Sequence, residues 1–286
     1  MLLQHTIKNA SKLLKSYNIA SHELDAEIIL SNIMGVTREY LILNNHITIP
    51  KKIMIKYNYA IERRAKYEPV AYIIGKKEFW SQDFEINQGI LVPRPETELL
   101  IHRLVNIFKN KTINILDIGT GSGCILLALL KELNSSRGVG IDISLNAVKT
   151  AEKNSKKLNL FYRSKFKLCN MDEFNSGKYD LIVSNPPYIP LRNLKKLSND
   201  IINFEPKIAL NGGHDGLDLI KKVIYKSNYL LKKNGLLAIE IGYKQYRNVS
   251  SLLKSSGYRE IFRECDYNRN VRCIISTKVD FFKYKK

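Results

Sequence analysis

The segment LIVSNPPYIP at 181–190 joins an apolar run directly to an amide, two prolines and a phenol. Consecutive prolines fix two φ angles and remove two backbone donors, so neither a helix nor a strand continues through them. An amide oxygen and a carbonyl in such a stiff turn can accept both hydrogens of a planar NH2 group and turn its nitrogen towards an electrophile. We assign these acceptors to Asn185 and Pro186. Pro187 would keep them rigid and Tyr188 would pack on the substrate plane, although a plain strand-terminating turn is the alternative.

A second polar segment, Gly119 to Gly123 (GTGSG), lies where another apolar run becomes a helical pattern. Glycines there let a ligand approach the backbone, and the N–H groups at the start of the helix are free to bind it. A dinucleotide fingerprint would require glycine where the chain has Cys124, and no Gly-Lys-Ser/Thr sequence of a Walker loop follows. The loop is therefore predicted to bind a nucleotide-like ligand of another kind.

Two carboxylates accompany this loop. Asp142 ends the next predicted strand, where a carboxylate can accept hydrogen bonds from both hydroxyls of a ribose, and a cap for the helix starting near Ser144 is the alternative. Asp117 comes just before the loop, and a carboxylate at a buried strand end needs donors such as the loop N–H groups or a ligand amine. Together they predict a nucleoside ligand with a positively charged tail.

Strands alternating with helices must position these residues. The predicted strands cover 113–118, 138–142, 166–170, 179–185, 235–242, 258–265 and 271–279, and the predicted helices cover 122–133, 144–158, 217–231 and 245–256. This alternation predicts an α/β fold with a largely parallel sheet covered on both faces, and one of the last two strands antiparallel at the edge. Because the carboxyl ends of parallel strands meet at one edge, the glycine loop, Asp142 and Asn185 are expected around one pocket.

The amino-terminal part has a different pattern. Residues 1–66 show apolar positions at helical spacing and predict a small helical bundle. From Lys77 to Val92 the pattern alternates, and Asn87 to Gly89 supplies a turn before a last strand at Ile90 to Val92, which predicts a β-hairpin joining two domains. The predicted domains are 1–76, 77–92 and 93–286.

Composition narrows the possible roles. The longest apolar run, Ile125 to Leu130, is far shorter than the roughly 20 residues of a membrane span, so we expect a cytoplasmic protein without a membrane partner. The four cysteines form no Cys-x-x-Cys pair and none lies at zinc-ligand spacing from a histidine, so no metal is expected. The formal net charge of +19 suits an anionic partner, but the lysines are scattered without a basic stripe, and composition explains the charge equally well.

These motifs resemble the class I S-adenosylmethionine-dependent methyltransferases with an Asn-Pro-Pro-Tyr motif, and among them the HemK/PrmC family, which methylates the glutamine amide in the Gly-Gly-Gln motif of class 1 peptide chain release factors. The resemblance covers nearly the whole chain, in segments 68–79, 91–98, 116–123, 139–142, 182–189, 205–218 and 238–242. Asn-Pro-Pro-Tyr alone specifies an NH2 acceptor. The segments PRPETE and GGHDGLD, with a helical amino-terminal domain, single out the release-factor branch.

The resemblance implies a Rossmann-like, seven-stranded, mostly parallel sheet with an antiparallel edge strand, and S-adenosyl-L-methionine as cofactor. It implies that the glycine loop contacts the methionine part of the cofactor, that Asp142 binds the ribose, and that Met171 is the nearest match to the residue covering the adenine. The expected cofactor-binding residues are Asp117, Gly119, Thr120, Gly121, Ser122, Gly123, Asp142, Met171 and Asn185; the expected catalytic residues are Asn185, Pro186 and Tyr188; and the expected substrate-binding residues are Asn185, Pro186, Pro187 and Tyr188. Arg94 either lines the pocket or lies at the surface beside Glu96 and Glu98.

Two other functions stay open at this point. One is a DNA or RNA adenine-N6 methyltransferase, which would flip a base into the same pocket and use the positive charge. The other is a ribosome- or RNA-binding protein that keeps the fold without catalysis. The only extensions are the helical domain and the segment from Leu191 to Phe204, which leaves little surface for reading a nucleic acid sequence. We therefore expect a monomeric enzyme that needs no direct nucleic-acid contact, whose helical domain recognises a release factor.

Overall fold

The computed structural model describes residues 1–279, which form two compact units. The first unit comprises Met1–Lys76 together with Leu197–Glu205, and the second comprises Lys77–Lys196 and the chain from Pro206 onward. Between residues 1 and 279, no helix combines the length and the apolar character needed to cross a lipid bilayer.

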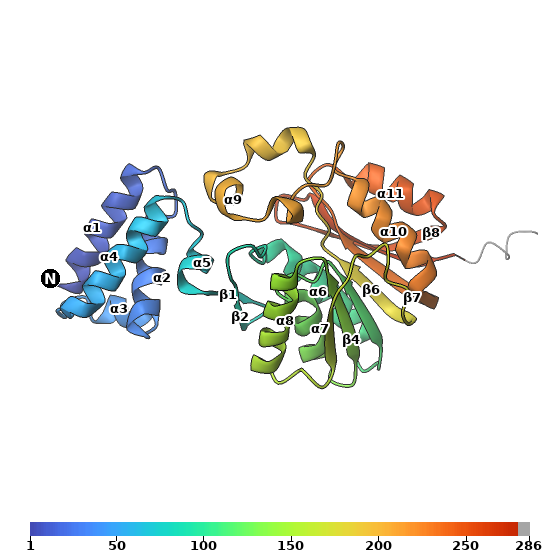
Figure 1. Ribbon diagram of the computed structural model, residues 1–286, viewed down its shortest axis with the longest axis horizontal. Coiled ribbons are helices and arrows are strands. Elements are labelled where there is room, and N and C mark those ends of the chain that lie inside the picture. The colour runs from blue at the N-terminus through green and yellow to red at the C-terminus, as the bar shows by residue number, and fades with distance from the viewer. Residues whose placement is uncertain (280–286) are drawn as a thin grey trace, which may run out of the picture. The chain divides into compact units, whose positions relative to one another are not determined.

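The first unit is helical, as predicted for the amino-terminal region (Figure 1). Its helices are α1 (Leu3–Ser16), α2 (His22–Met34), α3 (Arg38–Leu43), α4 (Lys51–Ala65), α5 (Val70–Ile74) and α9 (Asn199–Phe204). The apolar faces of α1, α2 and α4 form one core that includes Leu14, Leu30 and Tyr57. A buried ion pair between Asp25 and Arg64, 2.7 Å long, joins α2 to α4. The apolar positions at helical spacing in residues 1–66 thus correspond to one helical bundle with its own core.

A two-stranded hairpin opens the second unit, with β1 (Lys76–Phe79) paired to β2 (Gln82–Glu85). Its turn is Trp80–Ser81, where φ is 51° and 54°, a left-handed pair that matches the twist of a two-residue hairpin. The prediction placed the turn at Asn87 to Gly89 and a strand at Ile90 to Val92. The chain does turn there, with the Ile90 amide donating to the Asn87 carbonyl at 3.2 Å, but this turn does not close the hairpin. No strand follows it, because residues 90–92 form a loop with Ile90 and Val92 buried.

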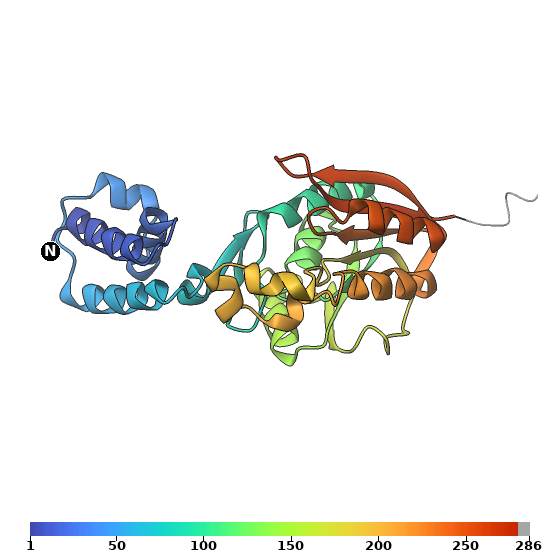
Figure 2. The same ribbon diagram turned by 90° about the horizontal axis from the view of Figure 1, so that it is seen from above.

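A seven-stranded sheet forms the middle of the second unit. Its strands are β3 (Asn114–Ile118), β4 (Arg137–Asp142), β5 (Ser164–Leu168), β6 (Tyr179–Ser184), β7 (Leu231–Glu240), β8 (Tyr258–Cys265) and β9 (Val271–Lys278). The strand order is β5-β4-β3-β6-β7-β9-β8, with β3 to β7 parallel and β9 antiparallel to both of its neighbours. The mostly parallel sheet with antiparallel pairing at one edge is confirmed, and the antiparallel strand is β9, which lies between β7 and β8. Strands β8 and β9 form the red hairpin in Figure 2.

Helices cover both faces of this sheet (Figure 1). They are α6 (Glu98–Phe108), α7 (Cys124–Glu132), α8 (Leu145–Lys157), α10 (Asp218–Leu230) and α11 (Tyr246–Ser255). The apolar stripes of α10 and α11 pack on strand residues such as Leu116, Ile182 and Leu237, while α6, α7 and α8 pack side by side with one another. The chain runs from β3 outward to β5, and then from β6 outward to β9 and β8, so the direction of winding changes between β3 and β6. Loops diverge at such a switch point and leave a crevice at the carboxyl ends of the strands.

Candidate active site

A cavity of about 480 Å³ lies at this crevice, within the second unit. Its wall is built from the loops that follow four neighbouring parallel strands and from the chain ahead of α6. The loops contribute Gly119–Ser122 after β3, Asp142–Ser144 after β4, Cys169–Met171 after β5, and Asn185 and Pro187 after β6. The expected meeting of these strand ends therefore occurs.

The glycine loop forms one wall of the cavity. Gly119 and Gly121 have φ values of 75° and 56°, and a Cβ on either would meet no atom of the described chain within 4 Å. Glycine is therefore required there by the left-handed backbone, and its missing side chain leaves the loop open to a ligand. The amides of Gly119 and Thr120 both donate to the Ile141 carbonyl, at 2.9 and 3.0 Å, which ties the loop to the end of β4.

Gly123 has a different role from the other two glycines. It does not line the cavity, and a Cβ on it would lie 3.1 Å from the Ala151 Cβ and 3.2 Å from the Leu127 Cδ1. Its φ of 79° makes it the left-handed residue before α7. The helix consequently begins at Cys124 rather than at Ser122, and Gly123 serves the close packing of α7 against α8.

Asp117, two positions before Gly119 in β3, is fully buried and does not itself line the cavity. Its Oδ2 accepts a 2.7 Å hydrogen bond from the Thr120 hydroxyl, whereas no atom of residues 1–279 donates to Oδ1. Burial raises the pKa of Asp117 to about 7, partly offset by the Thr120 hydrogen bond. The Ser122 hydroxyl, which lines the cavity, is likewise without a hydrogen-bond partner in the described chain. Of these two unpaired oxygens, that of Ser122 is on the cavity wall and suits a ligand that brings a donor.

Asp142 lines the cavity at the end of β4. Its Oδ2 accepts from the Gly121 amide and its Oδ1 from the Ser144 amide, both at 2.9 Å. The alternative role as helix cap is filled by Ser144, whose hydroxyl accepts from the Ala147 amide at the start of α8. Burial raises the pKa of Asp142, opposed by these amide hydrogen bonds. Each carboxylate oxygen still has a lone pair for a ligand hydroxyl.

The loop after β5 supplies Met171, which lines the cavity together with Cys169 and Asn170. Met171 also packs against the apolar core between the sheet and α10. Its side chain therefore forms a partly exposed apolar surface, and a flexible thioether suits contact with the flat face of an aromatic ring. Arg94 lines the cavity as well, ahead of α6.

Asn185 follows the last residue of β6 and faces the cavity, as does Pro187, while Pro186 is buried. The Asn185 Nδ2 donates to the Thr97 hydroxyl at 3.3 Å. Within residues 1–279, no hydrogen bond reaches the Asn185 Oδ1 or the Pro186 carbonyl oxygen. The turn thus has two oxygen acceptors without internal donors.

Tyr188 packs behind the Asn-Pro-Pro-Tyr turn, and its contact with the substrate plane stays a prediction. It is absent from the cavity lining, its hydroxyl donates to the Glu240 Oε1 at 3.3 Å, and a Cβ on Gly242 would lie 2.9 Å from its ring. Burial raises the pKa of Tyr188, so the phenol keeps its proton and acts as a donor. The position favours a role in holding the turn in place.

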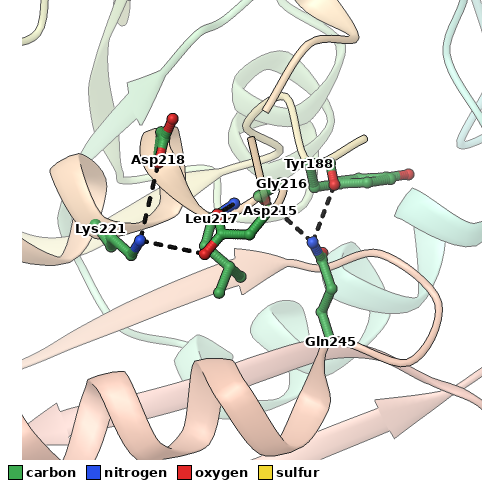
Figure 3. Close-up of polar contacts among 7 residues, drawn as sticks. All are labelled: Tyr188, Asp215, Gly216, Leu217, Asp218, Lys221 and Gln245. Carbon is green, nitrogen blue, oxygen red and sulfur yellow. Dashed lines mark hydrogen bonds and ion pairs between the residues drawn. The ribbon is translucent and has the colours of Figure 1, made fainter. Parts of the chain in front are cut away.

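Gln245, at the start of α11, clamps the same turn from behind (Figure 3). Its Nε2 donates to the carbonyls of Tyr188 and Gly216, at 3.0 and 3.1 Å, and its Oε1 accepts from the Gly242 amide at 2.8 Å. A Cβ on Gly216 would lie only 2.4 Å from the Tyr188 carbonyl oxygen, so the loop before α10 can approach the turn only with glycine there. One buried amide therefore joins three chain segments.

Sequence reasoning missed three residues of this site: Thr97, Glu240 and Gln245. The Thr97 hydroxyl donates to the Glu240 Oε2 at 2.6 Å, and both side chains are buried. Glu240 is the only charged residue in the segment LLAIEIG, and a carboxylate in an otherwise apolar buried strand is the signal that could have identified it. Thr97 and Gln245 had no comparable signal.

Two family models match the chain: a PrmC N-terminal domain at residues 5–75 and a methyltransferase domain at residues 109–277. The release factor glutamine methyltransferase of Buchnera aphidicola subsp. Schizaphis graminum is 38% identical over 97% of this chain and 100% of its own length. That of Caulobacter vibrioides is 36% identical over 93% of this chain and 92% of its own length. The chain belongs to the release factor glutamine methyltransferase family.

Solved structures agree with this family at the level of the fold. A methyltransferase from Pyrococcus furiosus is similar with a TM-score of 0.55, covering 77% of this chain and 99% of its own at 17% identity. The ribosomal protein L11 methylase from Lactobacillus delbrueckii subsp. bulgaricus has a TM-score of 0.50, covering 71% of this chain and 90% of its own at 19% identity. The second unit therefore has the Rossmann-like methyltransferase fold that the family resemblance implied.

Proposed function

We propose that this chain transfers the methyl group of S-adenosyl-L-methionine to the side-chain amide nitrogen of the glutamine in the Gly-Gly-Gln motif of class 1 peptide chain release factors. One observation carries the proposal: the turn after β6, whose residues Asn185 and Pro187 line the cavity with the glycine loop, has two oxygen acceptors without internal donors, Asn185 Oδ1 and the Pro186 carbonyl. A primary carboxamide has the two N–H donors that such a pair requires.

The residues around the cavity fit S-adenosylmethionine. The open backbone at Gly119 and Gly121 leaves room for a ligand, and a carboxylate at Asp117, buried two positions before Gly119, favours a cationic group in the cavity through its charge. Asp142 would bind the ribose hydroxyls through its remaining lone pairs, and Met171 would cover the adenine. When bound there, S-adenosylmethionine supplies an electrophilic methyl group.

The turn would activate the amide by orientation. A carboxamide nitrogen is a weak nucleophile because its lone pair is delocalised into the carbonyl. Asn185 Oδ1 and the Pro186 carbonyl would each hold one N–H, which aims the nitrogen lone pair at the cavity and favours pyramidalisation. Tyr188 and Gln245 keep the turn fixed, so little reorganisation accompanies the reaction. In the transfer, the N–C bond would form as the S–C bond of the sulfonium breaks, and the proton released from the amide nitrogen would pass to water.

The helical unit, residues 1–76, is proposed to recognise the release factor. Several of its apolar side chains are well exposed and would serve a protein partner better than water: Ile42, Leu43, Ile55 and Tyr59. Because the proposed substrate is a translation protein, the reaction belongs in the cytoplasm, and the chain acts as a monomer that needs no direct nucleic-acid contact.

Transfer of label from the cofactor tests the proposal. The purified chain is incubated with methyl-labelled S-adenosylmethionine and either a release factor, the same factor with its Gly-Gly-Gln glutamine changed to alanine, or a DNA duplex. Label on the unmodified factor alone is the expected result. Label on the duplex would favour the adenine methyltransferase alternative, and equal label on the glutamine-to-alanine factor would refute the proposed acceptor.

A further inference from the structure

The orientation of the Asn185 side chain decides whether it can serve as an acceptor. A carboxamide fits a site in two ways related by a half-turn, and only one presents Oδ1 to the cavity, while the other presents an NH2 group. A substrate NH2 group would then meet a second donor and lose a hydrogen bond. Something in the structure must hold the amide in the productive orientation.

The contacts of Thr97 determine this orientation. A hydroxyl has one hydrogen, and that of Thr97 lies in the short 2.6 Å bond to the Glu240 Oε2. Thr97 can then offer Asn185 only a lone pair, so the Asn185 nitrogen must face Thr97, as it does at 3.3 Å. The oxygen is thereby turned away from Thr97, and it stays free for a substrate because Asn185 lines the cavity.

We propose that Glu240 is a positioning residue, which through the Thr97 hydroxyl keeps the Asn185 oxygen turned towards the substrate amide. This inference rests on the proposed function and adds to it the residue that sets the orientation of the Asn185 side-chain amide. Glu240 also accepts from the Tyr188 hydroxyl at 3.3 Å, so one carboxylate holds both ends of the Asn-Pro-Pro-Tyr turn.

A role confined to packing is the simpler alternative for Glu240. Its side chain is fully buried at the end of β7, where an apolar residue would avoid the desolvation of a charge. An ionised carboxylate can only accept hydrogen bonds, so the hydroxyls of Thr97 and Tyr188 must both donate to it. A side chain that can also donate would leave the direction of these two hydrogen bonds open. The fixed direction of these hydrogen bonds, and not packing, thus explains why a carboxylate occupies this position.

Protonation of Glu240 would remove that directionality. A neutral carboxyl can donate to Thr97, whose hydrogen is then free for Asn185 Oδ1, so the amide can turn over. Burial raises the pKa of Glu240, opposed by Thr97, Arg272 and Tyr188. Three further ionisable groups interact electrostatically with Glu240, namely Glu96, Cys124 and Cys273. Methyl transfer should therefore be present above the pKa of Glu240 and be lost as the pH falls through it.

Four variants test this positioning role of Glu240 at saturating S-adenosylmethionine with a release factor as substrate. Glu240→Gln and Thr97→Val should each lower kcat/KM about tenfold, the effect of one hydrogen bond to a charged group, while the cofactor Kd changes less than about twofold. Thr97→Ser keeps the hydroxyl and should stay within about threefold of the unmodified enzyme. Glu264→Gln is the matched control, because Glu264 pairs with Cys273 from β8 just as Glu240 does from β7, and its carboxylate binds Arg103 outside the cavity.

Two further measurements distinguish positioning from structural support. The acid limb of the kcat/KM profile should disappear in Glu240→Gln and persist in Glu264→Gln. In ¹⁵N spectra, the side-chain NH2 signals of Asn185, identified by their loss in Asn185→Ala, should shift or broaden in Glu240→Gln and Thr97→Val. Thr97→Val provides the test if Glu240→Gln does not fold.

The outcomes separate this inference from the proposed function. If the unmodified enzyme left release factors unlabelled, the proposed function would be refuted. The Asn185 signals would still show whether Glu240 orients the Asn185 amide through Thr97. Wild-type kcat/KM and unchanged Asn185 signals in Glu240→Gln would overturn the inference. An equal loss of activity and cofactor binding in that variant would also overturn it, because the loss would then be structural.

Discussion

Replacing Gln245 with methionine tests whether the clamp behind the Asn-Pro-Pro-Tyr turn determines its rigidity. Methionine has a similar volume, so little of the effect comes from an empty cavity. The change removes three hydrogen bonds, of 2.8, 3.0 and 3.1 Å, and leaves two carbonyls and one amide without their partner. At about 1 kcal/mol for each bond, the free energy of unfolding of the second unit should fall by about 3 kcal/mol.

The assay follows unfolding in urea through Trp80, the single tryptophan, which belongs to the second unit. Gln4→Met, on the exposed surface of α1 in the first unit, is the control and should change stability by less than about 0.5 kcal/mol. In Gln245→Met, kcat/KM for methyl transfer should fall about tenfold or more while the cofactor Kd stays within about threefold. A loss below about 1 kcal/mol together with unchanged kcat/KM would refute the reasoning, because the turn would then be rigid without its clamp.

Three further predictions concern the cavity. Asn185→Ala should lower turnover about a hundredfold or more, with a much smaller change in the cofactor Kd by calorimetry; equal losses would contradict its role as an acceptor. Asp142→Asn should weaken cofactor binding about tenfold and leave kcat at saturation nearly unchanged, because the ribose is the only part of the cofactor that Asp142 is proposed to contact. Burial raises the pKa of Asp117 to about 7, and a cationic ligand group favours the ionised form, so binding should release a proton and affinity should rise as the pH increases through about 7. Calorimetry in buffers of different ionisation enthalpy checks this, and Asp117→Asn should abolish the pH dependence.

Much of the fold could be predicted from the sequence because the alternation of strands and helices is strong in the second unit. Element ends were less certain, since they depend on single residues: the left-handed Gly123 delays α7 to Cys124. The hairpin turn was misplaced because Trp80–Ser81 adopts left-handed φ values without glycine or asparagine, which are the residues that usually indicate such a turn.

The cavity wall could be predicted for a topological reason, since the carboxyl ends of parallel strands meet at one edge. Asp142, Asn185 and the glycine loop follow directly from strand ends. The side-chain contacts that support the wall could not be predicted, because the partners come from distant parts of the chain: Thr97 and Glu240 lie 143 positions apart. Such contacts depend on how helices and strands pack, which the local pattern does not specify.

A crystal structure of the chain with S-adenosylhomocysteine and a release factor would test the central claim most directly. The measurement is the pair of distances from the glutamine amide nitrogen to Asn185 Oδ1 and to the Pro186 carbonyl oxygen. Both should lie within hydrogen-bonding range, about 2.7 to 3.2 Å, with the cofactor sulfur on the opposite side of the nitrogen. A glutamine nitrogen bound by other groups, with Asn185 Oδ1 turned away from it, would contradict the account.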